Sequence, residues 1–172
     1  VVGADGFKVS GLNSQTHQSS VAVVVLDIDH FKRVNDEHCH DSGDKVLIEV
    51  SERIQRVLRA TDKLYRWGGE EFVIYFDFVD TATLDKVGER IRLAITETEI
   101  APVGQVTASM GVTVLKAQDT IDSMLLRADA ALYQAKSSGR NRVVTDAKNT
   151  ASKTDKKSAK SLFFFCAFCN CL

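Results

Sequence analysis

The chain has 172 residues, enough for one globular domain with a buried core, and 44% of them are hydrophobic. Its 22 basic and 23 acidic residues give a formal net charge of -1, which excludes the broad positive field typical of nucleic-acid-binding domains. No apolar run is long enough to span a membrane, and the N-terminus lacks the basic-then-apolar pattern of a secretion signal. We therefore expect a cytoplasmic domain that contacts neither nucleic acid nor membrane. Such a domain can be part of a longer protein.

The two ends of the chain differ in composition from its middle. Residues 1–20 are rich in Gly, Ser, Gln and Asn without a sustained period, which predicts a poorly ordered or altered N-terminal lead. Residues 147–172 begin with a Lys-rich stretch that lacks large apolar residues, so burial there cannot offset the entropy of ordering it. They end in an apolar, Cys-containing segment. We expect a disordered tail over 147–172 and a folded domain over 21–146.

The first half of the folded domain predicts a strand, a helix and a hairpin. Residues 21–26, VAVVVL, form a continuous β-branched run, typical of a strand buried on both faces. From 43 to 58, apolar residues recur at spacings of three and four, which predicts an amphipathic helix. Two apolar, aromatic-rich runs then flank Gly68 and Gly69, and this pattern indicates a hairpin.

Four more elements follow in the order helix, strand, helix and short edge strand, over residues 84–94, 105–115, 125–135 and 142–144. Within them, Gly111 predicts a bulge in its strand, and Gly139 predicts a C-cap of its helix. The complete order is strand, helix, hairpin, helix, strand, helix, strand. It predicts an α/β (α+β) sandwich, with a mixed central β-sheet flanked by helices, and excludes an alternating Rossmann repeat.

Acidic residues stand at two places where functional groups can be exposed. Asp27 and Asp29 follow the first buried strand, and an inward Ile28 between them makes the two carboxylates non-equivalent. Glu70 and Glu71 lie at the hairpin turn. Together these acids would form a cluster of oxygen ligands, which Mg²⁺ prefers and usually shares with phosphate groups. Each motif alone is more typical of a solvated strand end or a plain turn.

Four separated motifs carry a resemblance to a known family. They are LDIDHFKRVNDEHCHDSGDKVL over 26–47, RWGGEEF over 66–72, ASMGV over 108–112 and ADAALYQAKSSGRNRV over 128–143. In type, order and spacing they resemble the GGDEF family of diguanylate cyclases.

This resemblance implies a fold similar to that of nucleotidyl cyclases and polymerase palms. It also implies a homodimer in which two GTP-loaded domains face each other, and each 3′-hydroxyl attacks the α-phosphate of the other GTP. The products are cyclic di-GMP and two pyrophosphates.

The resemblance also assigns the metal ligands and the base. Asp27 and Glu70 match the family's Mg²⁺ carboxylates, with the carbonyl of Ile28 as a third ligand and Mn²⁺ as an alternative cofactor. Glu71 is the second acid of the motif and assists the metal or tunes Glu70. Glu70 is also the family's candidate for deprotonating the 3′-hydroxyl, which a bound cation would acidify.

Further residues match the family's GTP contacts. Asn35 and Asp44 resemble the guanine readers, with His40 near the same pocket. A carboxylate that accepts from the N1 and N2 hydrogens distinguishes guanine from adenine. The other expected substrate contacts are the backbone N–H groups of Phe31 and Lys32, the side chains of Lys136 and Arg140, and the turn glycines Gly68 and Gly69. Without the family match, Lys136 and Arg140 would be interpreted as a solvated helix end.

A separate set resembles the family's site for inhibition by bound product. Arg59 and Asp62 have the spacing of its RxxD motif, and Arg90 on the next predicted helix is a weaker candidate for the same ligand. Their alternative interpretation is an ordinary ion pair at the end of a helix.

The chain departs from the family pattern at two places. The usual first-helix motif is only echoed by VSGLNSQ over 9–15, and the usual glycine before His40 is Cys39. A positive φ at Cys39 would strain the loop beside the guanine pocket.

Two functions therefore remain at the level of sequence. The first is a Mg²⁺-dependent diguanylate cyclase with product inhibition, controlled in a parent protein by an upstream sensory or anchoring domain. The alternative is a catalytically weak or silent GGDEF domain that binds GTP or cyclic di-GMP as a receptor module. Retention of Gly68, Gly69, Glu70 and Glu71 favours the enzyme.

Overall fold

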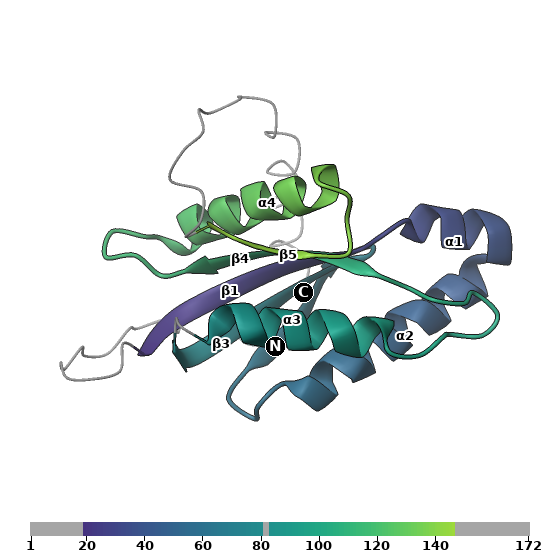
Figure 1. Cartoon of the computed structure of the whole chain (residues 1–172), viewed down its shortest axis with the longest axis horizontal. Helices are drawn as coiled ribbons and strands as arrows, with labels where there is room; N and C mark the ends of the chain where they lie inside the picture. The colour runs from purple at the N-terminus through teal and green to yellow at the C-terminus, as the bar shows by residue number, and fades with distance from the viewer. Residues whose placement is uncertain (1–18, 81–82, 147–172) are drawn as a thin grey trace, which may run out of the picture.

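Five strands form a single mixed sheet in the order β2-β3-β1-β4-β5 (Figure 1). The computed structural model describes residues 19–80 and 83–146. Its strands are β1 (Ser19–Ile28), β2 (Lys63–Gly68), β3 (Glu71–Asp80), β4 (Ala108–Val114) and β5 (Val143–Thr145). Its helices are α1 (Phe31–His38), α2 (His40–Val57), α3 (Leu84–Thr96) and α4 (Ile121–Ser137).

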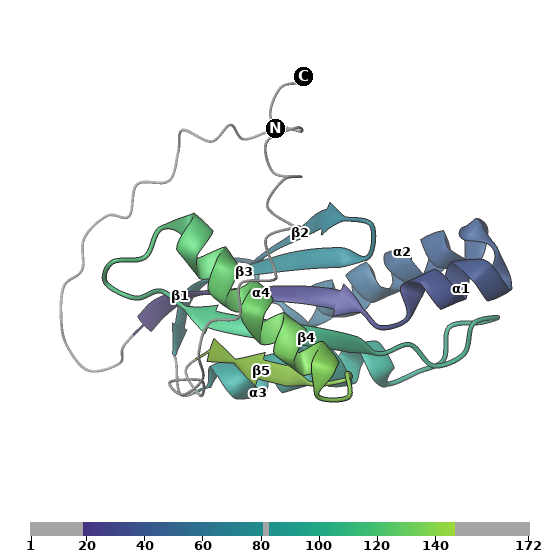
Figure 2. The same cartoon turned by 90° about the horizontal axis from the view of Figure 1, so that it is seen from above.

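The helices cover both faces of this sheet, with α2 and α3 on one face and α4 on the other (Figures 1 and 2). Central strand β1 pairs antiparallel with β3 and β4, whereas β4 pairs parallel with the edge strand β5. Alternate side chains of β1 enter two cores: Val24 and Leu26 join the larger one, and Val23 and Val25 pack with Leu132 of α4. The predicted sandwich and doubly buried strand are both confirmed.

Gly111 does not form the predicted bulge. The pairing of β1 with β4 runs without a break from Ala22 opposite Val114 to Ile28 opposite Ala108. A Cβ added at Gly111 would instead lie 1.9 Å from the carbonyl oxygen of Ala128 on α4. The bulge prediction was wrong, because this glycine serves the close packing of α4 on β4.

The helix predicted from residue 43 is the second of two helices. Helix α1 ends at His38, and α2 begins at His40. Cys39 between them has φ 70° and ψ 166°, a conformation that only glycine adopts easily. The concern that a cysteine would be strained at this position is therefore confirmed.

The predicted glycine lies just past the end of helix α4, whose last residue is Ser137 and whose C-cap is Ser138. Gly139 has φ 110°, and its N–H donates to the carbonyl of Lys136 at 3.5 Å. The N–H of Arg140 donates to the carbonyl of Ala135 at 3.0 Å. These two bonds form a Schellman motif, which satisfies carbonyls at the helix end.

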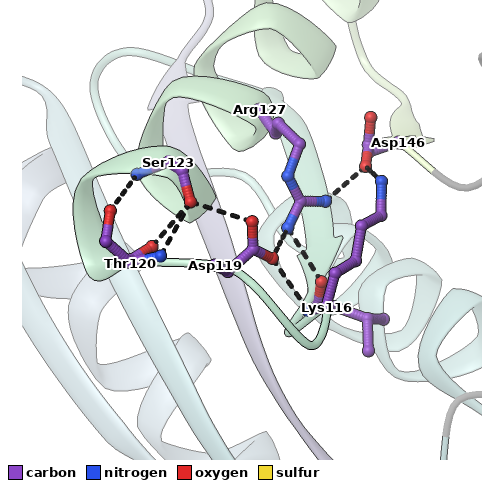
Figure 3. Close-up of polar contacts among 7 residues, drawn as sticks. Lys116, Asp119, Thr120, Ser123, Arg127 and Asp146 are labelled. Atoms are coloured by element: carbon purple, nitrogen blue, oxygen red, sulfur yellow. Dashed lines mark hydrogen bonds and ion pairs between the residues drawn. The ribbon is translucent and has the colours of Figure 1, made fainter.

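An ionic cluster fixes the orientation of α4 (Figure 3). Arg127 of α4 pairs with Asp119, before the helix, and with Asp146, after β5. Lys116 Nζ lies 2.8 Å from Asp146 Oδ2, and Ser123 Oγ donates to Asp119 Oδ1 at 2.8 Å. The cluster therefore ties the β4–α4 connection, the helix and the end of β5 together.

The predictions for the chain ends fall almost entirely on residues outside those described. These are residues 1–18 of the predicted N-terminal lead, including the motif echo over 9–15, and the tail over 147–172. Residues 19 and 20 were assigned to the poorly ordered lead, but they begin strand β1, so the prediction was wrong for those two residues. Within the described ranges, no helix has the length and apolar character required to cross a membrane.

Candidate active site

The signature acids converge because the β2–β3 hairpin places them beside the end of β1. Asp27, the next-to-last residue of β1, lies opposite Glu71, the first residue of β3. The N–H of Ile28 donates to the carbonyl oxygen of Glu70 at 3.3 Å. Asp27 thus meets Glu70 and Glu71, which follow it by more than forty positions in the chain, at one end of the central strands.

Burial and nearby negative charges raise the pKa values of these acids. Burial raises the pKa of Asp27, while the neighbouring Lys136 and Arg140 charges oppose that rise. Burial also raises the pKa values of Glu70 and Glu71, and the charge of Asp27 raises them further. A bound cation would relieve this unfavourable negative charge.

The acids fit a cation that is shared with a nucleotide. Among the described residues, no three His, Cys, Asp or Glu side chains converge closely enough to form a complete metal cage. Mg²⁺ commonly takes only one or two protein carboxylates and completes its shell with phosphate oxygens and water. The oxygen-only donors and raised pKa values of Asp27 and Glu70 agree with that mode.

Lys136 lies inside this acidic site. Its Nζ is 2.7 Å from Asp27 Oδ2, and its side chain is about one-third exposed. Arg140, four residues later, is close enough for its charge to lower the pKa of Asp27. The end of α4 therefore brings two cations to the carboxylates.

The expected guanine readers meet where α1 packs against α2. A Cβ added at Gly43 of α2 would lie 2.0 Å from Oδ1 of Asn35 on α1, so the two helices approach closely there. Asp44 follows Gly43 directly, and both Asp44 and His40 are exposed on the first part of α2. The structure thus brings Asn35 beside the Asp44 segment.

The expected phosphate-binding N–H groups open helix α1. Phe31 and Lys32 are its first two residues, and the first N–H groups of a helix have no acceptor within that helix. Helix α1 starts three residues after Ile28. These groups therefore lie near the strand end that carries Asp27.

The hairpin turn leaves open space for a ligand. A Cβ added at Gly68 or Gly69 would meet no atom within 4 Å. Arg66, which the sequence interpretation did not single out, donates from Nε and from a terminal guanidinium nitrogen to the carbonyl of Gly69 at 3.1 and 2.8 Å. Arg66 therefore fixes the turn from one side.

Asp29 has a different role from Asp27. It is buried and accepts hydrogen bonds from Thr107 Oγ1 and Ser109 Oγ, both at 2.7 Å, and from the N–H of Asn141 at 3.0 Å. The sequence interpretation assigned no partners to Asp29. The polar Thr107 and Ser109 around the start of β4 were the available signal.

The residues of the expected product site gather at the C-terminal end of α2. Asp62 Oδ2 accepts from the backbone N–H of Arg59 at 2.8 Å, so their contact is a turn closed by a carboxylate. Arg90 of α3 donates to the carbonyl of Val57 at 3.0 Å. Strand β2 separates this group from Gly68.

Comparisons with known proteins identify the family of this chain. The family model described as "Diguanylate cyclase, GGDEF domain" matches residues 7–142. The response regulator PleD of Caulobacter vibrioides is 42% identical over 132 residues, which cover 72% of this chain and 29% of PleD. Diguanylate cyclase DgcM of Escherichia coli is 36% identical over 123 residues, which cover 72% of this chain and 30% of DgcM. The chain thus spans about a third or less of these two relatives.

Solved structures show the same fold. The GGDEF domain of DgcB from Caulobacter crescentus, in complex with c-di-GMP, superposes with a TM-score of 0.72 at 35% identity, covering 75% of this chain and 79% of that one. The active GGEEF domain of a diguanylate cyclase from Vibrio cholerae gives 0.70 at 33% identity, covering 74% and 83%. The chain therefore belongs to the GGDEF family of diguanylate cyclases.

Proposed function

We propose that this domain condenses two GTP molecules into cyclic di-GMP and releases two pyrophosphates. The observation that carries the proposal is the meeting of Glu70, Glu71 and Asp27 with the cationic end of α4. The matched relative DgcM supports it, because that protein is named a diguanylate cyclase. The fold alone would not support it, because one fold serves many functions.

The cofactor in this proposal is a divalent cation, Mg²⁺ with Mn²⁺ as an alternative. Asp27, Glu70 and the carbonyl of Ile28 would hold it, with Glu71 in support. A bound cation neutralises the triphosphate and lowers the pKa of the attacking hydroxyl.

In the proposed reaction, Glu70 accepts the proton of the 3′-hydroxyl. Burial and the charge of Asp27 raise the pKa of Glu70, and a higher pKa makes its carboxylate a stronger base. The hydroxyl oxygen then forms a bond to the α-phosphorus of the GTP on the other domain, and the bond to pyrophosphate breaks. In the homodimer, each domain holds one of the two GTP molecules.

The remaining residues bind and orient GTP. Lys136 and Arg140, with the N–H groups that open α1, would hold the phosphates. Asp44 and Asn35, with His40 nearby, would read the guanine edge. In the free domain, the ammonium group of Lys136 pairs with Asp27. When the triphosphate and its cation bind, Lys136 can exchange this partner for a phosphate oxygen.

Regulation in the proposal involves product and parent protein. Cyclic di-GMP bound by Arg59, Asp62 and Arg90 would keep two domains from aligning their GTP sites. Because the chain spans only part of its curated relatives, an upstream sensory or anchoring domain is part of the proposal. The proposal includes a cytoplasmic location, which supplies the substrate GTP.

The proposal is tested with purified domain, GTP and Mg²⁺, and with products separated by chromatography. We expect one cyclic di-GMP and two pyrophosphates for every two GTP consumed. The rate per domain should rise with protein concentration, because the active species is a dimer. Binding of GTP or cyclic di-GMP with no product at any concentration would establish the receptor module instead.

A further inference from the structure

Three consecutive residues after α4 adopt left-handed backbone conformations. Gly139, Arg140 and Asn141 have φ values of 110°, 60° and 46°. Glycine adopts such values freely and asparagine tolerates them, but a long side chain such as arginine rarely does. A non-glycine residue keeps this conformation only where its surroundings impose it.

Asn141 is held from two directions. Its backbone N–H donates to Asp29 Oδ2 at 3.0 Å, and its side-chain Oδ1 accepts from a terminal guanidinium nitrogen of Arg92 at 2.8 Å. Arg92 belongs to α3, which lies on the opposite face of the sheet from α4 (Figure 1). Glu89, one turn earlier on α3, pairs with Arg92 Nε at 2.8 Å and orients its guanidinium.

Helix α3 reaches this turn because it packs on the edge strand. A Cβ added at Gly88 of α3 would lie 2.9 Å from Val143 Cγ1 of β5. Arg92 lies one helical turn beyond Gly88, so its side chain extends past β5 to Asn141. The contact between Arg92 and Asn141 therefore joins α3, on one face of the sheet, to the loop that follows α4, on the other face.

We propose that Arg92 is a positioning residue for the triphosphate: by holding Asn141, it fixes the left-handed backbone of Arg140 and thereby directs the Arg140 guanidinium toward the acidic site. Arg140 follows Lys136 by four residues, and Lys136 Nζ lies 2.7 Å from Asp27 Oδ2, so the turn that carries Arg140 adjoins the acidic site. This inference rests on the proposed function, in which Arg140 contacts phosphate. It assigns a part in substrate binding to α3, a helix with no residue in the expected GTP site.

A purely structural role would give a different pattern. Neither Arg92 nor Asn141 belongs to the two hydrophobic cores, and Asn141 is exposed. Loss of their contact should therefore leave the cores packed and relax only the turn. The predicted consequence is specific to ligands that carry the phosphates bound by Arg140.

The test is a double-mutant cycle measured by GTP binding in Mg²⁺, with a fluorescent non-hydrolysable GTP analogue. Arg92→Ala alone should weaken binding about five- to tenfold, less than the roughly ten- to hundredfold loss of a whole hydrogen bond to a charged group, because it loosens the Arg140 contact without removing it. In an Arg140→Ala background the same change should have less than about a twofold effect, because the two residues act as one unit. Binding of GMP, which lacks the terminal phosphates, should change less than about twofold in Arg92→Ala.

Two further variants separate positioning from charge and from folding. Asn141→Ala removes the same contact without changing charge, so it should reproduce the effect of Arg92→Ala. Arg56→Ala removes an exposed arginine of α2 that pairs with Glu52, and it should bind GTP like the wild type. Thermal unfolding of each variant reports whether the domain remains folded.

The outcomes distinguish this inference from the proposed function. Additive effects of Arg92→Ala and Arg140→Ala, or equal losses for GTP and GMP, would overturn the positioning role. A wild-type domain that binds GTP but forms no cyclic di-GMP would overturn the proposed function, and the binding cycle would still decide the role of Arg92. Absence of GTP binding by the wild type would overturn both.

Discussion

The amine of Lys136 lies 2.7 Å from Oδ2 of Asp27, so the end of α4 is joined to the end of β1 at the centre of the acidic site. Asp27 is buried beside other acids, and an unpaired buried charge there would be costly. In the free domain, Lys136 therefore supplies the positive charge that we expect a nucleotide-bound cation to supply later. The same lysine is then available for phosphate.

Glu70→Gln should abolish cyclic di-GMP formation while the domain still folds and binds GTP. The change removes the negative charge and the basicity of the side chain but hardly alters its volume. Turnover is measured by chromatography and GTP binding by fluorescence. Glu97→Gln, an exposed glutamate at the end of α3, is the matched control and should turn over normally. Near-normal product formation by Glu70→Gln would refute its assignment as base and metal ligand.

Asp44→Ala should reduce the preference for GTP over ATP. Guanine would lose a charged acceptor worth about 1.5–3 kcal/mol, or roughly ten- to a hundredfold in relative affinity. Asn35→Ala should act in the same direction and more weakly. Competition binding with both nucleotides measures the preference, and Asp41→Ala on the same helix controls for loss of an exposed carboxylate. An unchanged preference in both Asp44→Ala and Asn35→Ala would place the guanine pocket elsewhere.

Arg59→Ala should leave the initial rate normal but sustain turnover as product accumulates. The residue lies at the far end of β2 from Gly68, so its loss removes a contact to bound product without touching the acids. Titration of initial rates with cyclic di-GMP compares this variant with the wild type and with Arg56→Ala. Identical inhibition curves for all three proteins would leave Arg59 and Asp62 as a structural turn only.

Cys39→Gly should raise the free energy of unfolding by about 1 kcal/mol, because it relieves a conformation that is costly for any residue with a Cβ. Urea unfolding measures the change. Cys39→Ser keeps the Cβ and should show no such gain. Equal stability of the glycine and serine variants would mean that the junction between α1 and α2 relaxes without strain.

Arg127→Met should destabilise the domain near neutral pH by about 2 kcal/mol, between the values for exposed and buried ion pairs. Burial alone would raise the pKa values of Asp119 and Asp146. Hydrogen bonds and the charge of Arg127 outweigh burial at both residues, and the charge of Lys116 adds to them at Asp146, so both pKa values lie below the ordinary 3.8.

Carboxylates with lowered pKa values stabilise the folded state above their unfolded pKa, and that stability is lost as the pH falls through their folded pKa. The difference between wild type and Arg127→Met should therefore be constant above pH 5 or so and shrink below about pH 4. Thermal unfolding at a series of pH values checks this. A difference that does not depend on pH would show that packing of the Arg127 side chain, rather than its charge, stabilises the cluster.

Local patterns in the sequence determined most of the elements and the motif residues. The β-branched run of β1, the glycines of the hairpin and the glycine that ends α4 act through their nearest neighbours in the chain, so their effect can be predicted from short stretches. The spacing of the acidic and basic motifs was likewise enough to indicate the family.

Tertiary structure alone decided the contacts between distant segments. Asp29 meets Thr107, Ser109 and Asn141 across separations of 78, 80 and 112 residues, and no periodicity records such partners. The approach of α4 to Gly111 likewise depends on how a helix lies on a sheet. The sequence supplied the chemical groups, but close packing of the helices on both faces of β1 determined which groups meet. A strand that is buried on both faces restricts where the helices and strands packed against it can lie.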